Sequence, residues 1–174
     1  MPGATMNVMP SSLPLPQLEF AFEARVEVAP PVIVGPTPHG ERRMVPILGG
    51  VFEGPSLRGR ILPGGADWQI FRRDGVTELY ARYLMQTDSG AVIQVINRGL
   101  RHGPAEVMDR LRAGLPVDPS LYYFRASTEF EAPGEFEAPS APLAPELAVL
   151  NRSIFIATGE RHPAQVVVRF WKLL

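Results

Sequence analysis

The chain has 174 residues, of which 45% are hydrophobic, and its formal net charge is -1. This length is sufficient for one domain with a core, and the near-zero charge gives none of the basic character that nucleic-acid-binding proteins carry. Because the chain has no cysteine, disulfide bonds, thiolate zinc sites and cysteine nucleophiles are excluded. The many prolines and glycines favour short strands and frequent turns over long helices.

The N-terminal residues are not expected to form a secretory signal. Residues 1–16 are rich in proline, lack the charged and apolar regions of a secretory signal, and are predicted to be a disordered lead. No run of about 18 apolar residues occurs, so no membrane span is expected. We therefore expect a single domain over residues 17–174, located in the cytoplasm.

The first half of this domain reads as a series of strands. Residues 17–29 alternate strictly between apolar and polar side chains, which predicts a strand with one buried face. Residues 30–43 contain four prolines and are predicted to be an extended connection or an edge strand. Two further strands are expected over residues 42–54 and 57–62. The pair Gly49-Gly50 inside the strand over residues 42–54 indicates a bulge, a bend or a close approach of another group.

Residues 67–98 are predicted to form three antiparallel strands joined by two tight turns. Asp74-Gly75, taken as a two-residue hairpin loop, places Asp67 opposite Arg82. Ser89-Gly90, taken in the same way, places Arg82 opposite Asn97. A three-residue second loop would shift the register by one and remove Asn97 from this row.

The last part of the chain contains the one predicted helix, residues 104–113, which starts at a proline and ends before a glycine. A strand is expected over residues 121–131. A duplicated, proline-rich loop follows, which is either a flap over a barrel mouth or a tolerated insertion. Strands over residues 151–158 and 164–173 complete an all-β fold. It is predicted to be an antiparallel β-barrel of about eight or nine strands with one short helix.

Asp67 and Arg82 are the candidate catalytic residues. An ion pair inside a barrel costs desolvation, so its presence beside an apolar cavity indicates a site that orients or polarises a ligand. Arg82 would then stabilise an enolate or carboxylate, and Asp67 would orient Arg82 or act as a general base. The alternative is a structural salt bridge that sets the strand register.

The candidate substrate-binding residues are polar or aromatic side chains on or near the same strands. They are Trp68, Tyr80, Tyr83, Asn97, Arg98 and Asn151. Tyr80 and Tyr83 point to opposite faces, so at most one of them lines a pocket. Tyrosine and tryptophan in barrel strands also occur as packing anchors of the core. The two asparagines either bind a polar group or cap turns.

No cofactor is expected. The three histidines show no metal-ligand spacing, and the chain has neither a phosphate-binding loop nor a dinucleotide fingerprint. A small-molecule ligand or substrate is the expected partner. The partly apolar second face of the sheet favours a homodimer contact.

Several motifs occur in a characteristic order, the longest being Pro63-Gly64-Gly65-Ala66-Asp67-Trp68-Gln69. Shorter ones are Ala81-Arg82-Tyr83, Asn97-Arg98-Gly99 and Leu150-Asn151-Arg152. With these motifs, residues 17–174 resemble a widespread microbial family of small barrel proteins known as a domain of unknown function. The resemblance implies an antiparallel barrel similar to lipocalins and allene oxide cyclase. For some members it implies isomerase or cyclase activity without a cofactor.

Three functional hypotheses follow. The first is a cofactor-independent isomerase, cyclase or lyase acting on a small apolar oxygenated metabolite, such as an enone, a hydroxy-ketone or a polyketide-like compound. The alternative is a non-enzymatic barrel that binds a hydrophobic small molecule. The third is a scaffold barrel whose interior is filled by side chains, which the absence of a ligand-sized cavity would favour.

Overall fold

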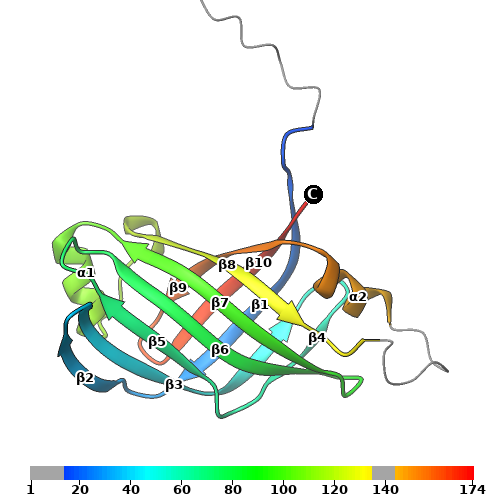
Figure 1. Ribbon diagram of the computed structural model, residues 1–174, viewed down its shortest axis with the longest axis horizontal. Helices are drawn as coiled ribbons and strands as arrows, with labels where there is room; N and C mark the ends of the chain where they lie inside the picture. The colour runs from blue at the N-terminus through cyan, green and yellow to red at the C-terminus, as the bar shows by residue number, and fades with distance from the viewer. Residues whose placement is uncertain (1–13, 135–143) are drawn as a thin grey trace, which may run out of the picture.

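The computed structural model describes residues 14–134 and 144–174. Its ten strands form one antiparallel sheet that closes into an eight-stranded barrel with two additional strands (Figure 1). The strands are β1 Leu18–Val28, β2 Val32–Thr37, β3 Gly40–Glu53, β4 Arg58–Ile61, β5 Ala66–Phe71, β6 Thr77–Thr87, β7 Val92–His102, β8 Tyr123–Glu131, β9 Phe155–Arg161 and β10 Gln165–Leu173. The helices are α1 Ala105–Arg112, the short 3-10 helix η1 Pro119–Leu121 and α2 Pro145–Arg152. The predicted all-β barrel is therefore confirmed.

Two predictions concern segments that are only partly described. Most of the lead expected over residues 1–16, and most of the duplicated loop after β8, lie outside the described residues. The predicted domain over residues 17–174 stays a prediction. None of the helices in the described ranges is long and apolar enough to cross a membrane.

The barrel closes where β1 pairs with both β10 and β3. Strand β3 is long enough to pair with β4 through its C-terminal part and with β5 through its N-terminal part. Both short strands also pair with β6, so together they occupy one strand position. The remaining edge of β3 carries β2, which is confirmed as an edge strand.

One half of the barrel interior is filled by aromatic side chains. Phe22 contacts the rings of Phe52, Phe130 and Phe170 at centroid distances of 5.6, 5.5 and 4.8 Å. Helix α2 packs Leu147 and Leu150 into this cluster. Tilted contacts between aromatic rings, together with apolar burial, thus make this half the solid core of the domain.

Helix α2 corrects the sequence interpretation, which placed a strand from residue 151. The chain is helical from Pro145 to Arg152, and β9 begins only at Phe155. Proline is favoured in the first turn of a helix, and the spacing of Leu147 and Leu150 puts both on one buried helix face. These signals were present in the sequence and were overlooked.

Helix α1 covers the opposite end of the barrel from α2 (Figure 1). Leu111 is buried against Leu79, Tyr122 and Phe124, and the neighbouring Val107 and Met108 pack on the same cluster. The helix ends at Arg112, and Gly114, two residues later, has a positive φ of 78° that suits a glycine following a helix. The predicted helix is therefore confirmed, with each boundary shifted by one residue.

The register predicted for the central strands is wrong by one residue. Asp67 pairs with Ala81, not with Arg82, and Ala81 pairs with Asn97. Both hairpins have three-residue loops that end in a glycine of positive φ, Gly75 and Gly90. Because both loops are longer by one residue, Asp67 and Asn97 remain in one row, while Arg82 leaves it.

Side chains in the two loops explain why the longer form is adopted. In the first loop, the Val76 N–H donates to Asp74 Oδ1 at 3.2 Å, and Arg72 forms ion pairs with Asp74 and Glu78. In the second loop, the Ala91 N–H donates to Thr87 Oγ1 at 3.0 Å. These local bonds satisfy backbone donors that a two-residue turn would pair differently.

The observed register changes which residues of neighbouring strands share a face of the sheet. Alternate residues along β5, β6 and β7 are buried inside the barrel, among them Gln69, Leu79, Tyr83 and Val95. Tyr80 and Leu84 are instead exposed on the outside of the barrel.

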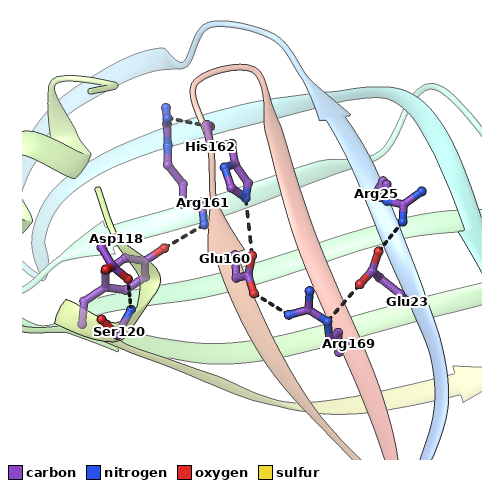
Figure 2. Close-up of polar contacts among 9 residues, drawn as sticks. Glu23, Arg25, Asp118, Ser120, Glu160, Arg161, His162 and Arg169 are labelled. Carbon is purple, nitrogen blue, oxygen red and sulfur yellow. Dashed lines mark hydrogen bonds and ion pairs between the residues drawn. The ribbon is translucent and has the colours of Figure 1, made fainter. Parts of the chain in front are cut away.

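A charged network crosses the outer face of β1, β10 and β9 (Figure 2). Arg169 forms ion pairs with Glu23, at 2.9 Å, and with Glu160, and Glu160 lies 3.5 Å from His162 Nε2. Hydrogen bonding from Arg169 holds the pKa of Glu160 below its usual range. The network therefore ties three neighbouring strands together on the barrel surface.

We expect Glu160→Gln to lower the free energy of unfolding by about 1 kcal/mol or less at neutral pH and low salt. The pKa of Glu160 is depressed in the folded state, so its contribution is present above the unfolded pKa and is lost as pH falls through the folded value. Urea unfolding of both proteins across acidic pH measures this difference. Glu19→Gln, which removes a more exposed pair with Lys172, is the control and should change stability less. A Glu160 effect that persists in molar salt would contradict the electrostatic explanation.

Candidate functional site in the barrel cavity

The half of the barrel nearest α1 encloses a cavity of about 450 Å³. Its walls are mainly aliphatic side chains from several strands, including Val26, Val45, Leu79, Val166 and Val168. The residues at its rim come from the β1–β2 connection, the end of α1 and the β9–β10 turn; they include Pro30, Gly114 and Pro163. The volume lies within the usual range of small-molecule sites, which argues against the side-chain-filled scaffold.

Among the described residues, Asp67 is the only acidic side chain that lines this cavity. Its Oδ2 accepts a hydrogen bond from Gln69 Nε2 at 2.6 Å. Its Oδ1 is shielded from solvent and has no hydrogen-bond partner among the described residues. Burial raises the pKa of Asp67, against the opposing effects of the Gln69 hydrogen bond and of Arg101. The carboxyl group therefore keeps its proton to higher pH than an exposed aspartate does.

Arg43 orients this carboxyl group indirectly. Its Nε donates to Gln69 Oε1 at 2.8 Å, so that Gln69 connects the guanidinium to Asp67. Burial, together with the charges of Arg101 and Arg161, lowers the pKa of Arg43 to about 10. Arg43 nevertheless remains protonated at neutral pH, and the Gln69 amide is held with its N–H toward Asp67.

Arg101 and Tyr83 supply further donors to the cavity. Arg101 is 2% exposed, and neither its Nε nor the Tyr83 hydroxyl has a partner among the described residues. Burial, and then the charge of Asp67, raises the pKa of Tyr83, so its hydroxyl stays neutral and able to donate. The cavity thus combines a protonatable carboxyl with free cationic and neutral donors.

Asn97 is the third predicted residue that lines the cavity. Its Oδ1 accepts a hydrogen bond from Thr128 Oγ1 at 2.7 Å. The row that runs from Asp67 across Ala81 to Asn97 consists of paired residues on adjacent strands, so these side chains share the barrel interior. The structure therefore brings together Asp67, Tyr83 and Asn97 of the predicted set.

The other predicted site residues lie away from the cavity. Arg82 donates to Gln94 on the outer face, and Arg98 forms an ion pair with Glu129 there. Trp68 and Tyr80 are 50% and 37% exposed on the same outer face. The opposition of Arg82 and Asp67, on which the catalytic role of Arg82 rested, does not occur.

Asn151 lies on α2 at the filled end of the barrel. Its side chain accepts from the Ala132 N–H at 2.9 Å and donates to the Ala132 carbonyl at 3.1 Å. It therefore holds α2 to the end of β8 and does not line the cavity.

Sequence reasoning missed the cavity arginines Arg43, Arg101, Arg112 and Arg161, and also Gln69. Gln69 follows Asp67 by two residues, and Arg101 follows Asn97 by four, so strand periodicity places each on the same face as its neighbour. That signal was available once one interior residue was known. The convergence of Arg112 and Arg161 depends on the packing of α1 and the β9–β10 turn. No group of histidine, aspartate or glutamate side chains in the described residues is arranged to hold a metal ion.

The family profile described as protein of unknown function, DUF3237, matches residues 16–173. The chain belongs to the DUF3237 family. It is 36% identical over 161 residues to a UPF0311 protein of Rhodopseudomonas palustris, a match that covers 92% of this chain and 99% of that relative. The motif-based resemblance to an uncharacterised barrel family is therefore confirmed.

Solved structures support the same fold. A protein of unknown function from Rhodopseudomonas palustris superimposes with a TM-score of 0.82 at 34% identity, covering 93% of this chain and all of that chain. A β-barrel-like protein from Acinetobacter baumannii gives a TM-score of 0.76 at 37% identity, over 94% of this chain and 99% of that chain.

An enzyme of known reaction type is a more distant relative. The hydroalkoxylation enzyme phnH of Penicillium herquei is 32% identical over 80 residues, which cover 46% of this chain and 53% of that protein. The crystal structure of an enzyme from the same organism shares the fold, with a TM-score of 0.65 at 20% identity over 95% of this chain and all of that chain.

Proposed function

We propose that the protein is a cofactor-independent isomerase, cyclase or lyase that acts on a small, largely apolar oxygenated molecule in the barrel cavity. The observation that carries the proposal is Asp67 Oδ1, a solvent-shielded carboxyl oxygen without a partner among the described residues. Such an atom is available to a ligand. Burial favours the neutral form of the carboxyl group, which can donate a proton.

The ring closure of a hydroxy-enone illustrates the proposed chemistry. The hydroxyl oxygen bonds to the β-carbon, the carbon–carbon π bond breaks, and the electron pair moves to the carbonyl oxygen as an enolate. Asp67 gives its proton to the α-carbon and recovers one from the attacking hydroxyl group. The product is an isomer of the substrate, so no oxidant, reductant or second substrate is required.

Three cavity residues would stabilise the enolate oxygen. Arg101 and Tyr83 have free donors, and Arg43 adds positive charge while it orients Asp67 through Gln69. Charged donors act strongly where water is excluded, and aliphatic side chains make up most of this wall. Their positions are set by barrel strands, so little reorganisation would accompany the reaction.

The reaction type of the relative from Penicillium herquei agrees with this chemistry. Hydroalkoxylation adds an alcohol across a carbon–carbon double bond, which is the bond change proposed above. The similarity covers less than half of this chain, so it supports the class of reaction and not a particular substrate.

We expect wild-type protein to convert a hydroxy-enone, such as ortho-hydroxychalcone, into its cyclic isomer faster than the protein-free reaction. Loss of the enone absorbance and chromatography of the product measure the conversion. Asp67→Asn should return the rate to near background, whereas Arg82→Ala, an exposed change on the next strand, should leave it within about twofold of wild type. Equal rates for wild type and a folded Asp67→Asn protein, across a panel of enones and hydroxy-ketones, would remove Asp67 from the mechanism.

The alternative function is a barrel that binds a hydrophobic small molecule without changing it. The predominantly aliphatic wall of the cavity favours this alternative. It predicts saturable binding and recovery of the ligand chemically unchanged, which the chromatographic assay distinguishes from catalysis.

A further inference from the structure

The cavity that carries the proposed function has an excess of positive charge. Within the described part of the chain, four arginines line it, Arg43, Arg101, Arg112 and Arg161, together with one carboxyl group, that of Asp67. They come from β3, β7, α1 and β9, so the folded barrel brings together charges that are far apart in the chain. Like charges that gather in one cavity repel one another unless an anion joins them.

The two inner arginines lack a carboxylate partner. Arg43 is 7% and Arg101 is 2% exposed, and no carboxylate of the described residues lies within the ion-pair distance of either. Arg43 has the hydrogen bond to Gln69, but Arg101 Nε has no acceptor in the described part of the chain. An uncompensated buried charge destabilises the folded protein, so binding of a compensating anion would be favoured.

The neighbouring groups compensate this charge only weakly. Burial raises the pKa of Asp67, so it holds its proton to higher pH than an exposed aspartate, which reduces the negative charge it offers to Arg101. The Phe124 ring lies 5.8 Å from the Arg101 guanidinium, near the limit for a cation–π interaction. Burial lowers the pKa of Arg101, but a guanidinium stays protonated at neutral pH, so Arg101 keeps its charge and its Nε is a free donor.

The charges of the two arginines at the cavity rim, Arg112 and Arg161, are better compensated. Arg112 lies 4.4 Å from the centre of the Phe71 ring and 3.7 Å from Glu41. Arg161 donates from Nη1 to the His162 carbonyl at 2.6 Å, apart from the outer network of Glu160 (Figure 2). Their position at the entrance suits attraction of an anion toward the cavity, with Arg101 deeper inside.

We propose that the molecule held in this cavity is an organic anion, either a small apolar carboxylate or the enolate of an enol as acidic as a carboxylic acid, whose charged oxygen binds Arg101. The inference rests on the proposed function because it names the substrate class of the same site. The apolar part of the anion would contact the aliphatic wall near Val26 and Val168. The charged oxygen would take the free hydrogen bond of Arg101 and offset the positive excess.

Cinnamate and cinnamide form a matched pair for testing this proposal, because they have nearly the same shape and differ in charge. We expect calorimetric titration of wild-type protein to give at least about tenfold tighter binding of cinnamate, the effect of one charge-assisted hydrogen bond. Equal affinities, tighter binding of the amide, or no binding of either compound would overturn the proposal.

Arg101→Gln should abolish the preference for the anion. Arg125→Gln removes an exposed arginine from β8, beside β7, and should retain the preference as the matched control. Circular dichroism and thermal melting establish whether each variant is folded; if Arg101→Gln does not fold, the wild-type affinity ratio still decides. An unchanged preference in folded Arg101→Gln would contradict binding at Arg101.

The preference for cinnamate and the turnover of hydroxy-enones test separate claims, so either claim can be rejected while the other holds. Selective binding of cinnamate without turnover of any hydroxy-enone would keep the anion site and reject the enzymatic function. Turnover without a preference for cinnamate would keep the enzymatic function and reject the anionic substrate class.

Discussion

Asp67→Asn is expected to lower turnover by about two to four orders of magnitude while making the folded protein more stable at neutral pH. The amide has nearly the same shape as the carboxyl group and can still accept the Gln69 hydrogen bond at its oxygen. It cannot donate and recover a proton as the reaction requires. The stability gain, roughly 1 kcal/mol, follows from removing a buried carboxyl group that is costly to ionise.

The pH dependence of the stability gain of Asp67→Asn shows whether the gain comes from removing a buried ionisable group. The folded pKa of Asp67 is raised by burial, so its proton stabilises the folded state fully below the unfolded pKa. That contribution is lost as pH rises through the folded pKa. The stability advantage of Asp67→Asn should therefore grow from acidic toward neutral pH.

Urea unfolding at several pH values, together with turnover of the hydroxy-enone panel, measures both effects. Tyr83→Phe removes another unpartnered cavity group and should reduce turnover without this pH-dependent gain in stability. A difference in unfolding free energy that is constant with pH would contradict the assigned ionisation of Asp67.

Gly50→Ala is expected to lower the free energy of unfolding by about 3 kcal/mol or more. Gly50 has a φ of 135° and lies on β3, where that strand pairs with Val26 of β1 and Ile61 of β4. A Cβ atom at this position would lie 2.0 Å from the Arg25 carbonyl oxygen. The clash is with backbone, so relieving it requires the β1–β3 pairing that closes the barrel to separate.

Gly64→Ala is the matched control because Gly64 also has a positive φ, 101°, but has open space where the Cβ would lie. It should cost roughly 1 kcal/mol, from the strain of the backbone conformation alone. Urea unfolding monitored by circular dichroism compares the two variants. Equal costs would mean that backbone strain, and not the contact across the closure, explains the requirement for Gly50.

Much of the fold follows from local sequence patterns. The alternation over residues 17–29 predicts β1 because side chains of a strand point alternately to its two faces. Pro104 and Gly114 bound α1 because they suit the start and the end of a helix. The α2 segment was not predicted although it carries a similar start signal, because it follows a proline-rich loop and its last two residues fall within the strand expected over residues 151–158.

The site was only partly predictable for a geometric reason. Identifying Asp67 and Asn97 required only that these polar residues lie on strands of an apolar sheet. Assigning Arg82 to the site required the loop length, and a change of one residue moves a side chain to the opposite face. Hydrogen bonds to the side chains of Asp74 and Thr87 within the loops decide the loop length. The turn dipeptides alone do not show that these weak local bonds form.

The sequence by itself determined a cysteine-free, turn-rich antiparallel barrel of a recognisable family, with Asp67 among its interior candidates. Only the tertiary structure decided which side chains surround that carboxyl group. Arg101 and Arg161 meet Asp67 in one cavity because the sheet closes on itself, and Arg112 joins them because α1 packs over one end. Local periodicity specifies the face of a strand, but contacts between distant strands depend on closure and register, which the whole barrel sets together.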